Sequence, residues 1–192
     1  MHVEVREYDP IWPEQFQILK SELQSALQNI PYISIEHVGS TSVPNLCAKA
    51  VIDIDIIIAP EHLDATIHAI TADGKYVCVG DQGILDRWAI RPTAGRFNVS
   101  PRRNIYVCIE GCLAVRNHLA VRDLCRCDAE VRERYAEVKR ELGARDWPAV
   151  LDYVKAKTEV LESMLTKAGF SEGELEQIAD AQHAKPYVLV EV

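Results

Sequence analysis

Two apolar runs of strand composition, at 33–38 and 51–58, constrain the fold of this chain more than any other feature. Turn residues separate the two runs, beginning with the string GSTS at 39–42. The second run carries Asp53 and Asp55, and because side chains alternate along a strand, both carboxylates project from the same face. Their apolar neighbours indicate a strand that is covered on both faces. The sequence therefore predicts two adjacent carboxylates inside a sheet; an exposed acidic edge strand is the alternative.

Two neighbouring carboxylates repel each other, so such a pair needs a cation or basic partners. Hard oxygen ligands on one face suit Mg²⁺, which keeps several waters and binds substrate phosphates, and Mn²⁺ accepts the same ligands. The turn at Gly39 can bring backbone N–H groups and the hydroxyls of Ser40, Thr41 and Ser42 close to an anion. The combination predicts a phosphate cradle beside a metal-binding carboxylate pair, whereas turn formation alone is the alternative role for these hydroxyls.

The same residues resemble a known family. A Gly-Ser pair followed by Asp-x-Asp on a strand is similar to the nucleotidyltransferase superfamily, whose fold is of the DNA polymerase β type. The fuller string EHVGSTSVP at 36–44 resembles the GrpB family of that superfamily. The opening YDPIWPEQF at 8–16 and the string HLAVRDLCR at 118–126 are similar to further motifs of that family. The resemblance covers about residues 8–165, which is most of the chain.

Other positions match or depart from the family pattern. Lys139 stands at the lysine of a Y-x-x-L-K motif, and Lys157 at that of a Y-x-x-x-K motif. We interpret Tyr135 and Lys157 as packing and rim residues. Asn45 stands where the family usually has glycine, and because asparagine tolerates a left-handed backbone, the turn is expected to survive.

The resemblance and the hydrophobic pattern predict an α+β fold with a mixed sheet, in which a helical C-terminal portion follows a nucleotidyltransferase-like core. We divide the chain into an αβ core at 1–112, a helical portion packed on it at 113–170 and a tail at 171–192, whose apolar end is expected to add an edge strand or mediate association. Periodicity and turn residues predict strands at 3–7, 33–38, 51–58, 76–79, 88–91 and 104–110, and helices at 9–27, 60–72, 114–124, 128–143, 147–168 and 171–181.

Composition narrows the classes of function. The 192 residues carry a net charge of −8, which argues against a general nucleic-acid-binding surface. No apolar run approaches the roughly twenty residues that span a bilayer, and the N-terminus is charged at once, so we expect a cytoplasmic protein. The six cysteines match no metal-binding spacing and are interpreted as free thiols.

Several charged residues are candidates to complete the site. Lys49, Arg87, Arg103 and Arg122 are candidate partners for a phosphate or carboxylate group, and a solvated surface cation is the alternative for each. Many nucleotidyltransferases draw a third carboxylate from a later strand. The resemblance therefore makes Glu110 the candidate third metal ligand, with an exposed glutamate at a strand end as the alternative.

These features support two main hypotheses. In the first, the chain is an enzyme in which Asp53 and Asp55 bind Mg²⁺ and act as catalytic residues, and a nucleotidyl group passes from a nucleoside triphosphate to an unknown small-molecule or protein acceptor. In the second, it is a nucleotide- or phosphate-ligand-binding module without transfer activity. Because related domains are fused to dephospho-CoA kinase, a CoA-like or adenylate ligand suits that hypothesis. A weaker third reading is an interaction partner that uses the helical portion and the tail. The acceptor, the base preference and the oligomeric state stay open.

Overall fold

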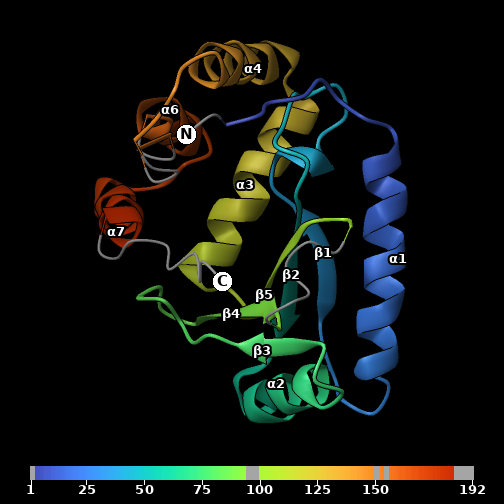
Figure 1. Cartoon of the computed structure of the whole chain (residues 1–192). Coiled ribbons are helices and arrows are strands. Elements are labelled where there is room, and N and C mark those ends of the chain that lie inside the picture. The colour runs from blue at the N-terminus through green and yellow to red at the C-terminus, as the bar shows by residue number, and fades with distance from the viewer. Residues whose placement is uncertain (1–2, 94–99, 149–151, 154–155, 184–192) are drawn as a thin grey trace.

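The protein folds around a five-stranded mixed sheet with helices on both faces (Figure 1). The computed structural model describes residues 3–93, 100–148, 152–153 and 156–183. The strands follow the order β1-β2-β5-β4-β3 across the sheet. β2 and β5 run parallel, and every other neighbouring pair is antiparallel. The strands are β1 (Ser34–Val38), β2 (Ile52–Ile58), β3 (Tyr76–Cys78), β4 (Arg87–Pro92) and β5 (Arg103–Ile109).

The helices lie in two groups on either side of this sheet (Figure 1). One face packs against α1 and α2, and the other lies under α3 and the helices that follow it. The helices are α1 (Ile11–Ala26), α2 (Leu63–Thr71), α3 (Leu113–Cys127), α4 (Ala129–Gly143), α6 (Thr158–Lys167) and α7 (Glu172–His183), with one-turn 3₁₀ helices η1 (Ser40–Ser42) and η2 (Pro60–His62). This arrangement confirms the predicted α+β fold with a mixed sheet. No helix among the described residues has the length and apolarity that crossing a membrane requires.

β2 lies inside the sheet, and its two faces have opposite chemistry. Ile52, Ile54, Ile56 and Ile58 alternate along it, are at most 1% exposed and pack against α1 and α2. Complete burial of each such side chain contributes roughly 1.5–3 kcal/mol. Because a one-residue slip would move the carboxylates into this isoleucine layer, the layer fixes the face on which the acids lie. We refer to that face as the acid face.

Strand register determines the neighbours of the carboxylates. Asp53 lies between Val38 on β1 and Asn104 on β5. Asp55 lies in the next row on the same face, between Glu36 and Tyr106. The residues next to the acid pair on β5 are therefore an amide and a phenol.

The loop after β1 is held by the helical portion. Val43, Leu46 and Cys47 are buried in one cluster with Tyr135 of α4 and Met164 of α6. The backbone that follows η1 is thus packed into a second hydrophobic core, separate from the isoleucine layer. Helix α4 begins as the sequence predicts, because the Asp128 carboxylate accepts hydrogen bonds from the amides of Glu130 and Val131.

Two predicted elements are wrong in part. The expected edge strand at 3–7 is reduced to a single bridge, in which Arg6 and Ala48 exchange two backbone hydrogen bonds of 2.8 Å. The expected helix at 147–168 does not start at Trp147, whose indole nitrogen donates to the carbonyl of Leu142 at 2.9 Å and docks the chain on the end of α4. Residues 152–153 are helical, a turn follows at 156–157, and helix α6 occupies Thr158–Lys167, so the later part of the expected helix is confirmed. The apolar end of the tail lies outside the described residues.

Candidate functional site

The bend at Gly39 lies directly against the acid face. Gly39 has φ 68° and ψ −176°, a backbone conformation that only glycine adopts readily. A Cβ atom built on Gly39 would come within 2.4 Å of Oδ2 of Asp53. Glycine is therefore required twice here, once for the backbone angle and once for the close approach of the bend to the carboxylate.

In each carboxylate of the pair, one oxygen is hydrogen-bonded to a neighbouring side chain. Oδ1 of Asp53 accepts a hydrogen bond from the Asn104 amide at 2.8 Å, and Oδ2 of Asp55 lies 2.7 Å from Nδ1 of His118 on α3. Oδ1 of the fully buried Asp55 has no hydrogen-bond partner among the residues that the structure describes. Burial raises the pKa of Asp53, and the hydrogen bond from Asn104 offsets this effect only in part.

His118 neutralises the deeper acid. Burial lowers the pKa of the imidazole, but the charge and hydrogen bond of Asp55 outweigh burial, so the net shift of the pKa is upward. The pair is therefore an imidazolium–carboxylate ion pair over a wider pH range than an isolated histidine would allow. Asp53 has no such basic partner within hydrogen-bonding distance among the described residues.

The three hydroxyls of η1 have different surroundings. The Thr41 hydroxyl donates to the Val51 carbonyl at 3.0 Å, and the Ser42 hydroxyl donates to the Gly39 carbonyl at 2.6 Å. Both bonds hold the turn itself. Ser40 instead hydrogen-bonds the side chain of Tyr135, and burial of that phenol raises its pKa. Of the three hydroxyls, that of Ser40 is the one in contact with the helical portion.

Three lysines converge near Asp53, from the loop before β2, from α4 and from the turn before α6. Lys139 is only 2% exposed, and in the described part of the chain it forms no salt bridge with a carboxylate. Burial and repulsion from Lys157 lower its pKa to about 7. Burial and repulsion from Lys49 likewise lower the pKa of Lys157 to about 8, against the attraction of Asp53. Burial lowers the pKa of Lys49 as well, with the same opposing attraction.

Two tyrosine rings contact this lysine cluster, which we define as Lys49, Lys139 and Lys157. The ammonium groups of Lys49 and Lys157 lie 6.0 and 4.8 Å from the ring centre of Tyr153. The ammonium group of Lys139 lies 5.0 Å from the ring centre of Tyr135. Such cation–π contacts stabilise a cation only in part. Within the described ranges the buried Tyr153 hydroxyl has no hydrogen-bond partner, so the cluster also has an unused polar atom there.

The structure brings Lys49 near Asp53 and places Arg122 and Arg87 on the strand neighbours of Asp55, but it keeps Glu110 and Arg103 apart from the acid pair. Glu110 lies in an exposed turn, four residues beyond Tyr106 along β5, which is roughly 13 Å along the strand. Arg122 is paired with Glu36 at 2.8 Å and with Asp123 at 2.7 Å.

The remaining two arginines lie over aromatic rings and not at the Gly39 bend. Arg87 is buried with its guanidinium 4.3 Å from the ring centre of Tyr106. Arg103 lies 5.6 Å from the ring centre of Tyr76, among residues of the opposite face.

A magnesium ion fits this arrangement only together with a ligand. No three His, Cys, Asp or Glu side chains of the described residues cluster closely enough to hold a metal ion. Oδ2 of Asp53 and Oδ1 of Asp55 remain without hydrogen bonds in the described part. Mg²⁺ commonly uses one or two carboxylates and completes its shell with waters and substrate phosphates. The residues therefore suit a substrate-dependent ion rather than a pre-formed metal centre.

Sequence reasoning missed the importance of Lys139, Lys157 and His118. Lys139 and Lys157 stand in family-like motifs, Y-x-x-L-K and Y-x-x-x-K, and those spacings were the available signal. His118 opens the family-like string HLAVRDLCR, which was the available signal, but its contact with Asp55 depends on α3 crossing above the strand.

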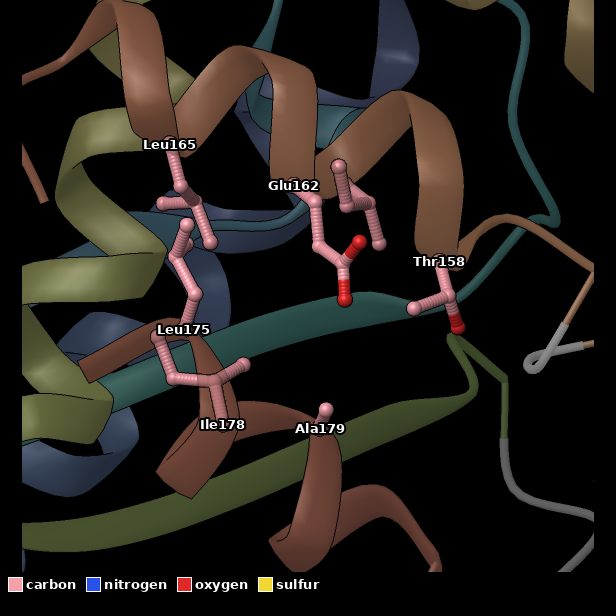
Figure 2. Close-up of a pocket in the computed structure, with 7 residues that line it drawn as sticks. Thr158, Glu162, Leu165, Leu175, Ile178 and Ala179 are labelled. Atoms are coloured by element: carbon pink, nitrogen blue, oxygen red, sulfur yellow. The ribbon is translucent and has the colours of Figure 1, made fainter. Parts of the chain in front are cut away.

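A crevice between α6 and α7 can be excluded as a ligand site (Figure 2). Its volume of about 10 Å³ has room for a single water. Leucine, isoleucine and alanine side chains line most of it, and Glu162 points into the space between the two helices (Figure 2).

Comparison with known proteins agrees with the fold and the motifs. The family described as GrpB protein matches residues 2–167. The UPF0157 protein BH1888 of Halalkalibacterium halodurans is 30% identical over 164 residues, which cover 84% of this chain and 80% of that protein. The UPF0157 protein SCO7215 of Streptomyces coelicolor is 31% identical over 176 residues, which cover 88% of this chain and 86% of that protein.

A solved structure shows the same architecture. The crystal structure of the conserved protein GrpB from Enterococcus faecalis matches with a TM-score of 0.73 and 24% identity, covering 91% of this chain and 99% of that one. At that identity the likeness establishes a common fold. With the family match over nearly the whole chain, the protein belongs to the GrpB family of the nucleotidyltransferase-like superfamily.

Proposed function

We propose that this protein binds a nucleotide or another phosphate-bearing ligand between the Gly39 bend and the lysine cluster. The observation that carries the proposal is Lys139, a buried lysine whose ammonium group faces an aromatic ring and forms no salt bridge with a carboxylate of the described residues. A buried ammonium group is costly unless an anion compensates it. A ligand phosphate would provide that compensation.

The local charge balance supports an anionic ligand. Asp55 is already paired with His118, so Asp53 is the carboxylate of the pair left to balance the lysine cluster. When all three lysines are protonated, three positive charges face one negative charge. A phosphate dianion would neutralise the remainder and would raise the lysine pKa values back toward the ordinary range.

Neutral donors add specificity for phosphate. The Gly39 bend presents its backbone beside Asp53, and Ser40 and Tyr135 contribute hydroxyls between the bend and Lys139. Successive backbone N–H groups in a turn with a left-handed residue form a concave site for anions. We expect this bend to hold phosphate oxygens while the lysines supply the charge.

A thermal unfolding series in EDTA tests the proposal. Pyrophosphate and ATP should each raise the melting temperature of the wild type, by about 5 °C or more at 100 times the dissociation constant. Lys139→Met should abolish the shift, because it removes the charge and keeps the volume. Lys75→Met is the matched control, since the Lys75 side chain is 47% exposed on the surface. An unchanged shift in Lys139→Met would place the ligand elsewhere.

Metal-dependent nucleotidyl transfer is the second candidate function. The free oxygens of Asp53 and Asp55, on one face of β2, favour it. A bound Mg²⁺ would supply charge neutralisation on the transferred phosphate. The chain's own contribution would be to position the triphosphate at the bend and an unknown small-molecule or protein acceptor beside it.

Pyrophosphate release separates the two candidates. We expect release from ATP or another nucleoside triphosphate to require Mg²⁺ and to disappear in Asp53→Asn and Asp55→Asn, if transfer occurs. Binding in EDTA without release, across a panel of acceptors, supports the binding module alone. CoA and adenylates belong in the same ligand panel.

A further inference from the structure

A second cleft opens on the other side of the Gly39–Asn45 loop, away from the acid pair. Its volume is about 650 Å³, within the range of small-molecule pockets. Helix α1, strand β1, the loop after η1, the end of α3 and the start of α4 all contribute to it. The lining side chains that matter below are Phe16, His37, Ser42, Arg126 and Arg132. We refer to it as the α1–α4 cleft.

Two arginines give this cleft a positive wall. Arg126 donates two hydrogen bonds to the Ser42 carbonyl, at 3.2 and 2.8 Å, and Arg132 donates one to the Cys125 carbonyl at 3.1 Å. Carbonyl oxygens therefore fix both guanidinium groups while leaving some of their N–H groups unused. Fixed guanidinium groups of this kind suit carboxylate and phosphate oxygens.

The positive charge of this wall is not balanced locally. No acidic side chain lines the cleft among the described residues. Asp123 lies 3.9 Å from Arg126 but is also the partner of Arg122, and Arg132 makes no ion pair within the described part of the chain. Burial, followed by repulsion from Arg126 and Arg122, lowers the pKa of His37 to about 4, so its imidazole is neutral at physiological pH.

The opposite wall is apolar and aromatic. Phe16 stacks on His37 with 4.6 Å between ring centres and 11° between planes. The Thr41 hydroxyl donates its proton to Val51, so it accepts one from Nε2 of His37 and leaves Nδ1 unprotonated. Pro13 and Pro44 complete this wall. The cleft thus combines an apolar surface with two anchored cations.

We propose that the α1–α4 cleft binds a small organic anion in which an apolar or aromatic body carries a phosphate or carboxylate group. The anionic group would lie against Arg126 and Arg132, and the body against Phe16 and the two prolines. This site is separate from the lysine cluster, because it uses different side chains on the other side of the loop. It does not depend on the function proposed above.

Titration by ¹H–¹⁵N NMR tests this inference with three probes: phenyl phosphate, inorganic phosphate for the charge alone and benzyl alcohol for the ring alone. Phenyl phosphate should shift the signals of Phe16, Ser42 and the Arg126 side chain. It should bind there at least fivefold more tightly than either partial probe. Equal affinity of phenyl phosphate and benzyl alcohol would overturn the proposed role of the arginines.

Variants distinguish this cleft from other anion sites. Arg132→Gln should weaken binding about tenfold, whereas Arg134→Gln, on the same helix with its side chain 72% exposed, should not change it. Gln17→Glu adds a negative charge to the lining of the cleft at an exposed helical position and should weaken binding without disturbing the core. Each variant is used only after its unfolding curve matches that of the wild type.

The location of the shifted signals separates the two proposals. Lys139→Met should leave binding in the α1–α4 cleft unchanged. Shifts confined to Ser40 and Tyr135, and lost in Lys139→Met, would overturn the cleft proposal while supporting the lysine site. Equal losses in Arg132→Gln and Arg134→Gln would also overturn it, because they would indicate general attraction of anions to the surface.

Discussion

Replacing Lys139 with methionine is expected to stabilise the free protein and to abolish phosphate binding at the same time. The substitution keeps a long, unbranched side chain at a position that is 2% exposed. It removes a charge that Asp53 compensates only in part. A stabilising substitution that removes binding would show that the lysine is retained for its ligand rather than for the fold.

The size of the effect follows from the pKa. Lys139 titrates at about 7 in the folded protein, and an unfolded lysine titrates at about 10.4. Each unit of pKa shift corresponds to about 1.4 kcal/mol, so this lysine lowers the free energy of unfolding by roughly 4 kcal/mol at pH 7. Because the folded value lies below the unfolded value, the stability of the wild type rises with pH in this window. The cost falls to roughly 2 kcal/mol at pH 9.

Urea unfolding at pH 7 and pH 9 measures this difference. We expect Lys139→Met to exceed the wild type by about 4 kcal/mol at pH 7 and by about 2 kcal/mol at pH 9. The control Lys75→Met replaces an exposed lysine, so its difference from the wild type should not vary with pH in this way.

One result would refute the reasoning. If Lys139→Met is less stable than the wild type at both pH values, the ammonium group is already compensated inside the protein. The pKa of Lys139 would then be ordinary, and the argument for an external anion would lose its main observation.

Three further outcomes are expected. Gly39→Ala should lower the free energy of unfolding by about 1–3 kcal/mol, because no other residue tolerates this backbone conformation. The added methyl group should also displace the Asp53 carboxylate. Urea unfolding measures the first effect and a crystal structure the second. His118→Ala should cost about 3–5 kcal/mol, since it leaves the Asp55 carboxylate buried and unpaired. Folding raises the pKa of His118, so the ion pair stabilises the protein fully below about pH 6.5, and this stabilisation is lost as the pH rises through the pKa of the folded state. The difference in stability between His118→Ala and the wild type should therefore shrink at high pH. Iodoacetamide should alkylate Cys112 faster at pH 7 than it alkylates the exposed Cys127, because hydrogen bonds from a neighbouring thiol and from helix amides lower the pKa of Cys112 to about 6; equal rates by mass spectrometry would contradict this.

The sequence predicted the strands better than the helical portion, for a physical reason. Strand alternation is a local pattern, so the isoleucines of β2 were enough to place Asp53 and Asp55 on one face. The helix expected at 147–168 fails at its start, where Trp147 contacts the end of α4, and such a contact leaves no periodic signal in the sequence. Tertiary contacts of this kind override helix propensity.

The candidate site divides in the same way. The Gly39 bend and the acid pair are close in sequence and were found together. Lys139 and Lys157 lie about a hundred residues from that bend, and each alone is indistinguishable from a surface cation. The placement of Glu110 could not be predicted, because the register of β5 against β2, rather than its alternation, puts it far from Asp55.

Net charge is a poor guide to the ligand of this protein, because the relevant charges are few and buried. The chain carries a net charge of −8, yet cations dominate at the Gly39 bend, where the lysine cluster faces one unpaired carboxylate. The acidic residues that produce the net charge are mostly exposed, and salt and water screen them within about 10 Å. Lys139 is buried and Lys49 and Lys157 are half-buried, so these charges are screened less. An acidic protein can therefore hold an anion where packed helices shield its lysines from water. In this protein, Tyr135 and Met164 pack against the loop that follows the Gly39 bend and provide that shielding.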